Sequence, residues 1–266
     1  MPLKIVINEE NLLLNLSTLK NKVGERKICA VLRGNAYGHG LIRVALTISN
    51  QVDSIAVTSC ADGVKLRKYG VKLPIIVLLP TIDNSLAKEY DLQLKSEFYD
   101  NLILNADTYR GASQDGATAC DELDDLRCGM CLYGYPKGFN PVMEVYSRVL
   151  AIKKLAPYQS LGCSKYLSSS RGDTIAMIVG GYADGFGRDF LGSHLLIRDK
   201  TYPIIGVSMD TTFLKVDDSV SVGDEVVICG SSKFASRYFD TLAEEIGTVP
   251  YELMTRFGQV IQYGKE

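Results

Sequence analysis

The residues that could carry out chemistry are few, and they concentrate in short polar turns. His39 and His194 are the only histidines, and nothing around them suggests a Ser–His–Asp arrangement. Among seven cysteines, Cys128 and Cys131 come closest together, in the segment CGMC. A second pair with metal-ligand spacing is missing, so we expect free cytosolic thiols and no metal site.

The segment RGNAYGHG, residues 33–40, combines Arg33, Tyr37 and His39 with turn-forming glycines. It follows the apolar run ICAVL at 28–32, which we expect to form a buried strand. In α/β proteins with parallel sheets, ligands bind at the carboxyl ends of the strands. The segment therefore occupies the kind of position where a ligand site is expected.

Helices and strands are expected to alternate up to about residue 80. The patterns predict helices over 11–24, 41–50 and 60–70, and strands over 28–32, 55–58 and 74–80. Such alternation implies right-handed βαβ units and a parallel sheet. A closed eight-unit barrel needs about 250 residues, and only residues 1–135 are available for it. We therefore expect an incomplete (β/α) barrel of the TIM type.

The pattern changes after about residue 140. Short β-like runs are separated by Gly, Pro and Asp turns, with no long helix expected until 237–247. The runs are RVLAIKKL, TIAMIV, HLLI, YPIIGVS, TTFLKV and DEVVIC. We expect a barrel domain over 1–138 and a mostly antiparallel β domain over 139–266, joined near the Gly- and Pro-rich segment GYPKGFNP.

The composition excludes several classes of protein. Apolar residues make up 46% and charged residues 23% of the 266 residues, as in ordinary globular proteins. Lys and Arg number 29 against 31 Asp and Glu, without a long basic run, so a nucleic-acid partner is not expected. No run of about 18 apolar residues predicts a membrane span. The start, MPLKIVINEE, lacks the apolar core of a signal peptide, so we expect a cytoplasmic protein.

Six segments, taken together and in order, resemble motifs of the alanine racemase family. VLRGNAYGHG at 31–40 looks like the motif that carries the cofactor lysine, and RCGMCLYG at 127–134 is similar to the motif at the end of the barrel. GGYADGF, VSMD, VGDEVVICG and GTVPYELM, between residues 180 and 254, resemble motifs of the β domain and the C-terminal region. A lone GYADG would be weak, whereas six ordered motifs are a strong signal.

The resemblance implies a barrel that binds pyridoxal 5′-phosphate and a β domain that completes the site of a partner chain in a head-to-tail dimer. It also implies the interconversion of L-alanine and D-alanine. A lysine amine serves one face of the substrate and a tyrosine from the partner serves the other, because inversion of a centre needs bases on both sides. The cofactor ring acts as the electron sink.

The resemblance also assigns cofactor contacts to six positions: Tyr37, Thr108, Arg127, Gly129, Met130 and Tyr251. Of these, the hydroxyl side chains and the backbone at 129 and 130 match phosphate contacts. Arg127 matches the arginine that faces the pyridine nitrogen and, because a guanidinium keeps its proton, would leave that nitrogen unprotonated. Tyr182 and Met209 match partner-side residues near the substrate entrance.

Two catalytic positions depart from the family. Arg33 stands where the family has its cofactor lysine, and Cys163 stands where it has its catalytic tyrosine. A covalent link to the cofactor needs a neutral amine, which arginine does not supply, whereas a thiol can still transfer protons. Gly206 stands where an arginine is usual, and the middle of the barrel is missing between Pro80 and Asn105.

These positions also have structural interpretations. Arg33 could be a structural or phosphate-binding residue at a strand end, and Cys163 a small core thiol. His39 could support the turn, and the rings of Tyr37 and Tyr251 could pack with the hydroxyl on a backbone group. Arg127 could pair with Asp124 or Asp125.

Three functions remain open on the sequence. An active racemase of unusual type would need another lysine, such as Lys137 or Lys165, to reach the cofactor. A non-catalytic relative would retain the fold or the cofactor affinity and act by binding, as a homodimer or in a mixed dimer with an intact racemase. A decayed remnant would have open edge strands, exposed apolar faces and no function of its own.

Overall fold

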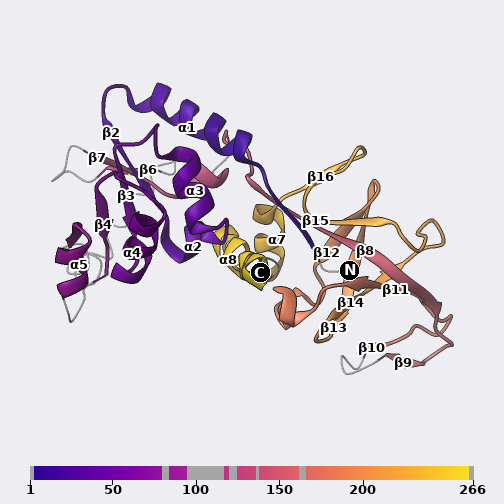
Figure 1. The fold of residues 1–266 in the computed structure, drawn as a ribbon. Helices are drawn as coiled ribbons and strands as arrows, with labels where there is room; N and C mark the ends of the chain where they lie inside the picture. Colours follow the sequence, from indigo (N-terminus) through magenta and orange to yellow (C-terminus); the bar gives the residue numbers. More distant parts are fainter. Residues whose placement is uncertain are drawn as a thin grey trace. The chain divides into compact units, whose positions relative to one another are not determined.

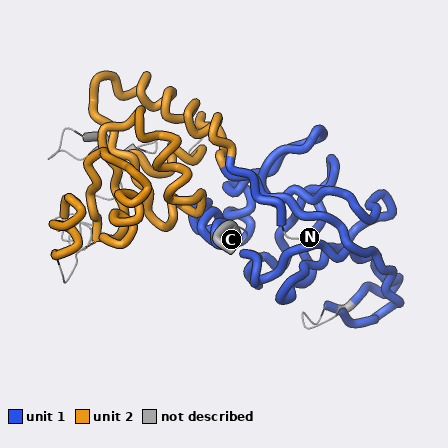
Figure 2. Tube along the Cα trace, viewed as in Figure 1, with its two compact units in different colours: residues 1–7, 143–266 blue, residues 8–142 orange. Residues whose placement is uncertain are grey.

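The computed structural model describes residues 3–79, 84–94, 117–119, 125–135, 138–161 and 166–263. The chain divides into two compact units, residues 8–142 and residues 1–7 together with 143–266 (Figure 2). Each unit has a sheet and a buried core of its own. The described helices include none that is long and apolar enough to cross a membrane.

Unit 2 of Figure 2, residues 8–142, is built on a sheet with the order β5-β4-β3-β2-β7-β6 (Figure 1). Neighbours from β5 to β7 are parallel, and β6 is antiparallel to β7. The strands are Lys27–Val31 (β2), Ser54–Val57 (β3), Ile75–Val77 (β4), Leu92–Leu94 (β5), Ala117–Ala119 (β6) and Asp125–Cys128 (β7). Among the described residues no pairing joins β5 to β6, so the part of the sheet that the structure describes does not close into a barrel.

Helices connect these strands and cover the sheet. They are Glu9–Val23 (α1), Leu41–Ile48 (α3), Cys60–Lys68 (α4) and Ser85–Glu89 (α5). Every residue of β3 and β4, and all but the first residue of β2, is buried. Strands covered on both faces are expected to be continuous apolar runs, which is how ICAVL and PIIVLL read in the sequence.

Helix α1 anchors the chain that follows β7. The side chain of Asn15 is fully buried, and its amide donates to the carbonyl oxygens of Leu132 at 3.0 Å and Asn140 at 2.7 Å. Its Oδ1 accepts from the N–H of Asn140 at 2.7 Å. Because buried backbone groups need partners, this one side chain fixes two segments that lie more than a hundred residues away in sequence.

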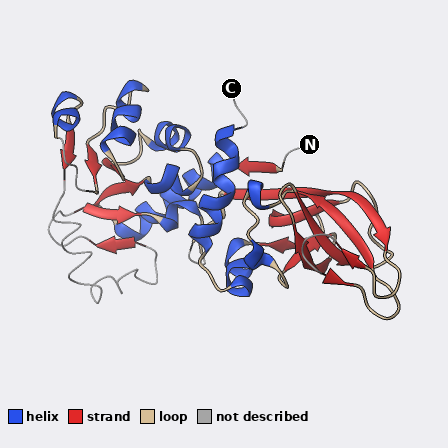
Figure 3. Ribbon diagram, turned by 90° about the horizontal axis from the view of Figure 1, so that it is seen from below, coloured by secondary structure: helices blue, strands red, loops and turns tan. Residues whose placement is uncertain are grey.

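Unit 1 of Figure 2, residues 1–7 with 143–266, contains a closed antiparallel barrel (Figure 3). The pairing runs β8-β11-β14-β13-β12-β15 and returns from β15 to β8. These strands are Met143–Lys154 (β8), Thr174–Val179 (β11), His194–Ile197 (β12), Lys200–Val207 (β13), Thr211–Val216 (β14) and Glu225–Ser231 (β15). The mostly antiparallel β domain predicted from the sequence is confirmed.

Shorter elements extend this barrel. Strand β1 (Lys4–Ile7) pairs with β8, strand β16 (Ser236–Arg237) pairs with β15, and β9 (Ser160–Leu161) pairs with β10 (Tyr166–Leu167). Two helices close the chain, α7 (Phe239–Ile246) and α8 (Pro250–Tyr263). Rings of Phe186, Phe190 and Phe257 pack edge to face, with centroids 5.3 to 6.2 Å apart, and so join α8 to the loops after β11.

Candidate functional site

Four predicted site residues lie at one edge of the parallel sheet. β2 and β7 are parallel neighbours in register, so the segments that follow them leave the sheet at the same edge. Arg33 follows β2, whereas Arg127 lies near the end of β7 and is followed closely by Gly129 and Met130. Met130 begins the short 3₁₀ helix η2 (Met130–Tyr133), and both arginines are half-buried. Residues distant in sequence thus meet where a ligand site is expected.

Residues Arg33–Tyr37, drawn as α2, form a left-handed turn. The φ angles of Gly34, Asn35, Ala36 and Tyr37 lie between 50° and 58°. Such a conformation costs residues with a Cβ about 1–2 kcal/mol each, so it needs support from the surrounding structure. Part of that support is local, because Oδ1 of Asn35 accepts from the N–H of Leu41 at 2.8 Å.

His39 supplies more of that support. Its ring is fully buried, and Nδ1 lies 3.0 Å from the carbonyl oxygens of both Ala36 and Tyr37. Since carbonyl oxygens only accept, Nδ1 carries the proton, and Nε2 is a buried acceptor without a hydrogen-bond partner among the described residues. Burial lowers the pKa of His39 to about 4. His39 is therefore a neutral, turn-supporting histidine.

Tyr37 leaves the turn and packs over one face of the sheet. Its ring contacts a buried cluster made by Cys29, Val31, Ala56, Ile76 and Leu78. A Cβ placed on Gly129 would lie 3.0 Å from the hydroxyl oxygen of Tyr37. The structure therefore brings Tyr37 and Gly129 together, and a side chain at position 129 would require the Tyr37 hydroxyl to shift by a few tenths of an ångström.

Tyr133 completes this arrangement, although its motif alone does not single it out. The residue is fully buried, and its hydroxyl donates to the carbonyl oxygen of Val31 at 3.3 Å. Its ring centroid lies 5.0 Å from that of Tyr37 and 4.5 Å from that of His39. Burial raises the pKa of Tyr133 well above its ordinary value, so the hydroxyl serves as a structural donor.

The remaining described site residues belong to unit 1. The N–H groups of Tyr182 and Ala183 donate to the carbonyl oxygens of Ser208 and Met209, both at 3.0 Å. Tyr182, at the start of the 3₁₀ helix η3 (Tyr182–Asp184), and Met209 are therefore neighbours, with exposed fractions of 50% and 58%. Tyr251 lies in the first turn of α8 and is also exposed.

Four sequence predictions fall elsewhere. Thr108 and Cys163, as well as the alternative lysines Lys137 and Lys165, lie outside the described residues.

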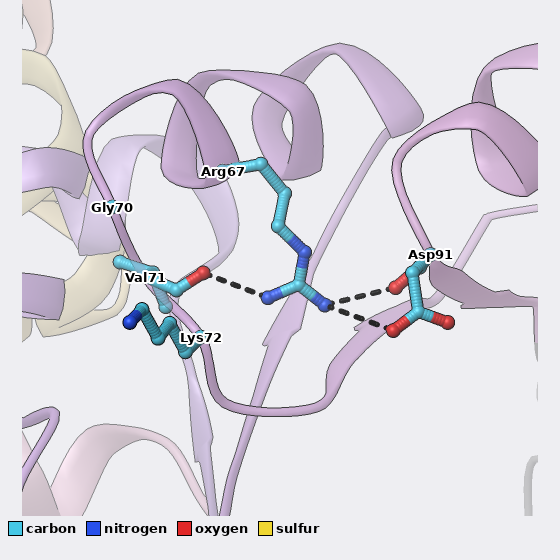
Figure 4. Close-up of a pocket in the computed structure, with 5 residues that line it drawn as sticks. All are labelled: Arg67, Gly70, Val71, Lys72 and Asp91. Carbon is cyan, nitrogen blue, oxygen red and sulfur yellow. Dashed lines mark hydrogen bonds and ion pairs between the residues drawn. The ribbon is translucent and has the colours of Figure 1, made fainter.

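A shallow surface depression of about 340 Å³ lies away from this edge (Figure 4). It is lined by Arg67, Gly70, Val71, Lys72 and Asp91. The guanidinium of Arg67 donates to the carbonyl oxygens of Val71, Leu73, Tyr90 and Asp91 at 2.7 to 3.0 Å. The arginine thus ties together the ends of α4 and α5 and is engaged by backbone groups, which marks it as structural.

Comparison with known proteins covers both units. The family model of the alanine racemase N-terminal domain matches residues 7–97, and that of the alanine racemase C-terminal domain matches residues 142–263. The alanine racemase of Clostridium kluyveri is 24% identical over 356 aligned positions, which span 95% of this chain and 91% of the relative.

Solved structures share the fold. The crystal structure of alanine racemase from E. faecalis matches with a TM-score of 0.81 at 18% identity, covering 96% of each chain. Alanine racemase from Bartonella henselae with covalently bound pyridoxal phosphate matches with a TM-score of 0.79 at 17% identity, covering 97% of each chain.

The alignment with the C. kluyveri protein also measures what this chain lacks. Because 95% of 266 residues is about 253, about 100 of the 356 aligned positions have no residue here. That length corresponds to several βα units. The two domain matches nevertheless follow one another in order along most of the chain. The protein is therefore a member of the alanine racemase family.

Proposed function

We propose that this chain is a non-catalytic member of its family, descended from an enzyme that interconverts L-alanine and D-alanine with pyridoxal 5′-phosphate. The observation that carries the proposal is Arg33 at the end of β2, in the position that the motif assigns to the cofactor lysine. An amine that loses its proton condenses with an aldehyde, whereas a guanidinium stays protonated and does not. The lost barrel positions point in the same direction.

The edge formed by β2 and β7 retains part of a phosphate site. Gly129 has no Cβ to crowd the Tyr37 hydroxyl, and its backbone is only half-buried beside that hydroxyl. This geometry supports a non-covalent contact with an anionic group. It does not support covalent attachment, because the segment 33–40 contains no lysine. The residues present therefore fit a phosphate but not the chemistry of a racemase, and we derive no catalytic step through the cofactor.

Borohydride trapping tests the proposal. Wild-type protein incubated with L-alanine and pyridoxal 5′-phosphate is expected to form no D-alanine and no specific covalent adduct. The variant Arg33→Lys is expected to trap the cofactor on residue 33, because it restores an amine there, yet still to form no D-alanine, because Cys163 and the missing positions are unchanged. Chiral chromatography measures the product, and peptide mapping locates the adduct.

Arg26→Lys is the matched control for non-specific modification, since Arg26 is exposed just before β2. D-alanine made by the wild-type chain alone, with an adduct on Lys137 or Lys165, would refute the proposal in favour of an unusual racemase. An Arg33→Lys variant that traps nothing would show that the missing barrel positions also prevent covalent attachment of the cofactor.

A second role, as partner in a homodimer or in a mixed dimer with an intact racemase, is favoured by Tyr182 and Met209. Backbone hydrogen bonds place these two residues side by side, and their exposed fractions are 50% and 58%. The resemblance assigns them to the partner's substrate entrance. Co-expression with an intact alanine racemase and native mass spectrometry is expected to detect the mixed dimer. Replacing both residues with glutamate should weaken association at least about tenfold, whereas Phe234→Glu, at another exposed position, should not.

A further inference from the structure

Three cysteine side chains gather where β2 and β7 run side by side. Cys29 lies in β2, Cys128 ends β7, and Cys131 lies in η2. None of the three is in a disulfide, and each has at most 1% of its surface exposed. The described residues include no group of three ligands that could hold a metal ion. The chemistry open to these thiols on their own is thiol–disulfide exchange.

Cys128 and Cys131 interact directly. The Cys128 thiol donates a hydrogen bond to the sulfur of Cys131, which lowers the pKa of Cys131 and raises that of Cys128. Burial opposes the effect on Cys131, but backbone N–H groups of η2 and the ammonium of Lys22 in α1 favour its thiolate further. The pair is therefore unequal, with one sulfur suited to attack and the other holding a proton, as in redox-active CxxC segments.

Cys29 is the competing partner, and sheet geometry disfavours it. Residue 30, not residue 29, lies opposite Cys128 in the parallel pairing of β2 and β7. Because successive side chains along a strand point to opposite faces, Cys29 and Cys128 leave the sheet on opposite sides. Cys29 joins the cluster beneath Tyr37 instead. A disulfide between Cys29 and Cys128 would require one strand to rotate locally, whereas a disulfide between Cys128 and Cys131 would not.

We propose that Cys128 and Cys131 form a reversible disulfide, which makes the turn at Gly129 and Met130 a redox-sensitive modification site. The proposal does not depend on the proposed function, since it concerns only the thiols and the backbone between them. The bridge would restrain the same turn that brings Gly129 to the hydroxyl of Tyr37. The turn at Gly129 and Met130, where the family resemblance places phosphate contacts, would then respond to the thiol–disulfide balance of the surrounding solution.

The oxidant is a low-molecular-weight disulfide such as oxidised glutathione. The Cys131 thiolate attacks one of its sulfurs, and the other half leaves as a thiolate. Cys128 then loses its proton to solvent and attacks the Cys131 sulfur, which releases the second small thiolate. The protein pair gives up two electrons and two protons, and the small disulfide becomes two thiols. Because both sulfurs are buried, we expect exchange to be slow and to need local opening of the segment.

The sequence gives this reaction a clean readout. Cleavage after Arg127 and Lys137 releases the peptide CGMCLYGYPK, which contains both thiols and no other cysteine. Oxidation makes this one peptide lighter by two hydrogen atoms, without joining it to another. Native protein is equilibrated in glutathione redox buffers, quenched with acid, alkylated and mapped. The same protein in concentrated urea provides the reference for a pair that the fold no longer holds together.

We expect the equilibrium constant for oxidation of this pair to be at least about tenfold larger in the native protein than in urea, which corresponds to about 30 mV in reduction potential. Cys131→Ser should abolish the mass change, and Cys60→Ser, at a buried thiol on α4, should leave it intact. A constant no larger in the native protein would overturn the proposal. So would a crosslink between this peptide and ICAVLR, which carries Cys29. Both outcomes are read on the wild-type chain, so they do not depend on the folding of a variant.

Discussion

Lowering the pH from 6.5 to 4 is expected to destabilise residues 8–142 by about 3 kcal/mol, because His39 must stay neutral where it is buried. Burial lowers the pKa of His39 from 6.5 to about 4. The unfolded chain therefore binds a proton below pH 6.5 that the folded unit takes up only near pH 4. Each pH unit in this window removes about 1.4 kcal/mol of unfolding free energy. Stability is complete above pH 6.5 and is lost as the pH falls.

The protein contains no tryptophan, so hydrogen exchange of the β2 peptide 28–33 at increasing urea is the suitable measurement. His39→Asn is the informative variant, since the amide of Asn keeps a donor near the position of Nδ1 and does not titrate. It should be less stable at neutral pH and lose most of the pH dependence between 6.5 and 4. His194→Asn, in the other unit and 43% exposed, should keep it. Equal slopes in wild type and His39→Asn would contradict the assignment.

Gly134→Ala is expected to destabilise the same unit by at least about 4 kcal/mol. Gly134 follows η2 with a φ of 99°, and an added Cβ would lie 2.4 Å from Cα of Pro141 and 2.5 Å from the carbonyl oxygen of Asn140. These are backbone atoms, and the buried side chain of Asn15 holds Asn140 in place. Residues 140 and 141 cannot move away from residue 134 without breaking the hydrogen bonds between Asn15 and Asn140.

Gly138→Ala separates steric overlap from backbone strain. Gly138 has nearly the same φ, 101°, but nothing lies within 4 Å of an added Cβ. The control should therefore cost only about 1–2 kcal/mol, the penalty of the left-handed conformation. Urea midpoints from hydrogen exchange of the segment 125–135 compare the two variants. Similar losses of stability in both variants would show that residues 134 and 141 have room for an added Cβ, contrary to this prediction.

Local patterns predicted the strands and the longer helices of residues 8–80, and the reason is physical. A strand covered on both faces must be an apolar run, so β2, β3 and β4 can be recognised without knowing their neighbours. Helix α1 is equally easy to recognise in the sequence, because its leucines recur at helical spacing and Gly24 ends it with a positive φ. The site edge followed from the rule that ligands gather at the carboxyl ends of parallel strands.

Features that depend on distant contacts could not be predicted in this way. Strand β1 pairs with β8, about 140 residues further on, and four residues carry no signal for such a partner. The left-handed turn is another example, because glycine explains its first residue, but Ala36 and Tyr37 adopt that conformation with the help of buried His39. The spacing of Cys128 and Cys131 is visible in the sequence, whereas their contact depends on η2.

The strands of residues 143–266 from β8 to β15 pair in a ring, because β15 pairs again with β8. Each of these six described strands therefore has a partner on both sides, and none is an edge strand that lacks a neighbour. About 100 positions of the family alignment have no residue in this chain, and among the described residues it is the sheet of residues 8–142, and not the barrel, that lacks a closing pair. This difference between the two sheets gives a physical reason why about 100 positions can be lost while the β barrel stays intact.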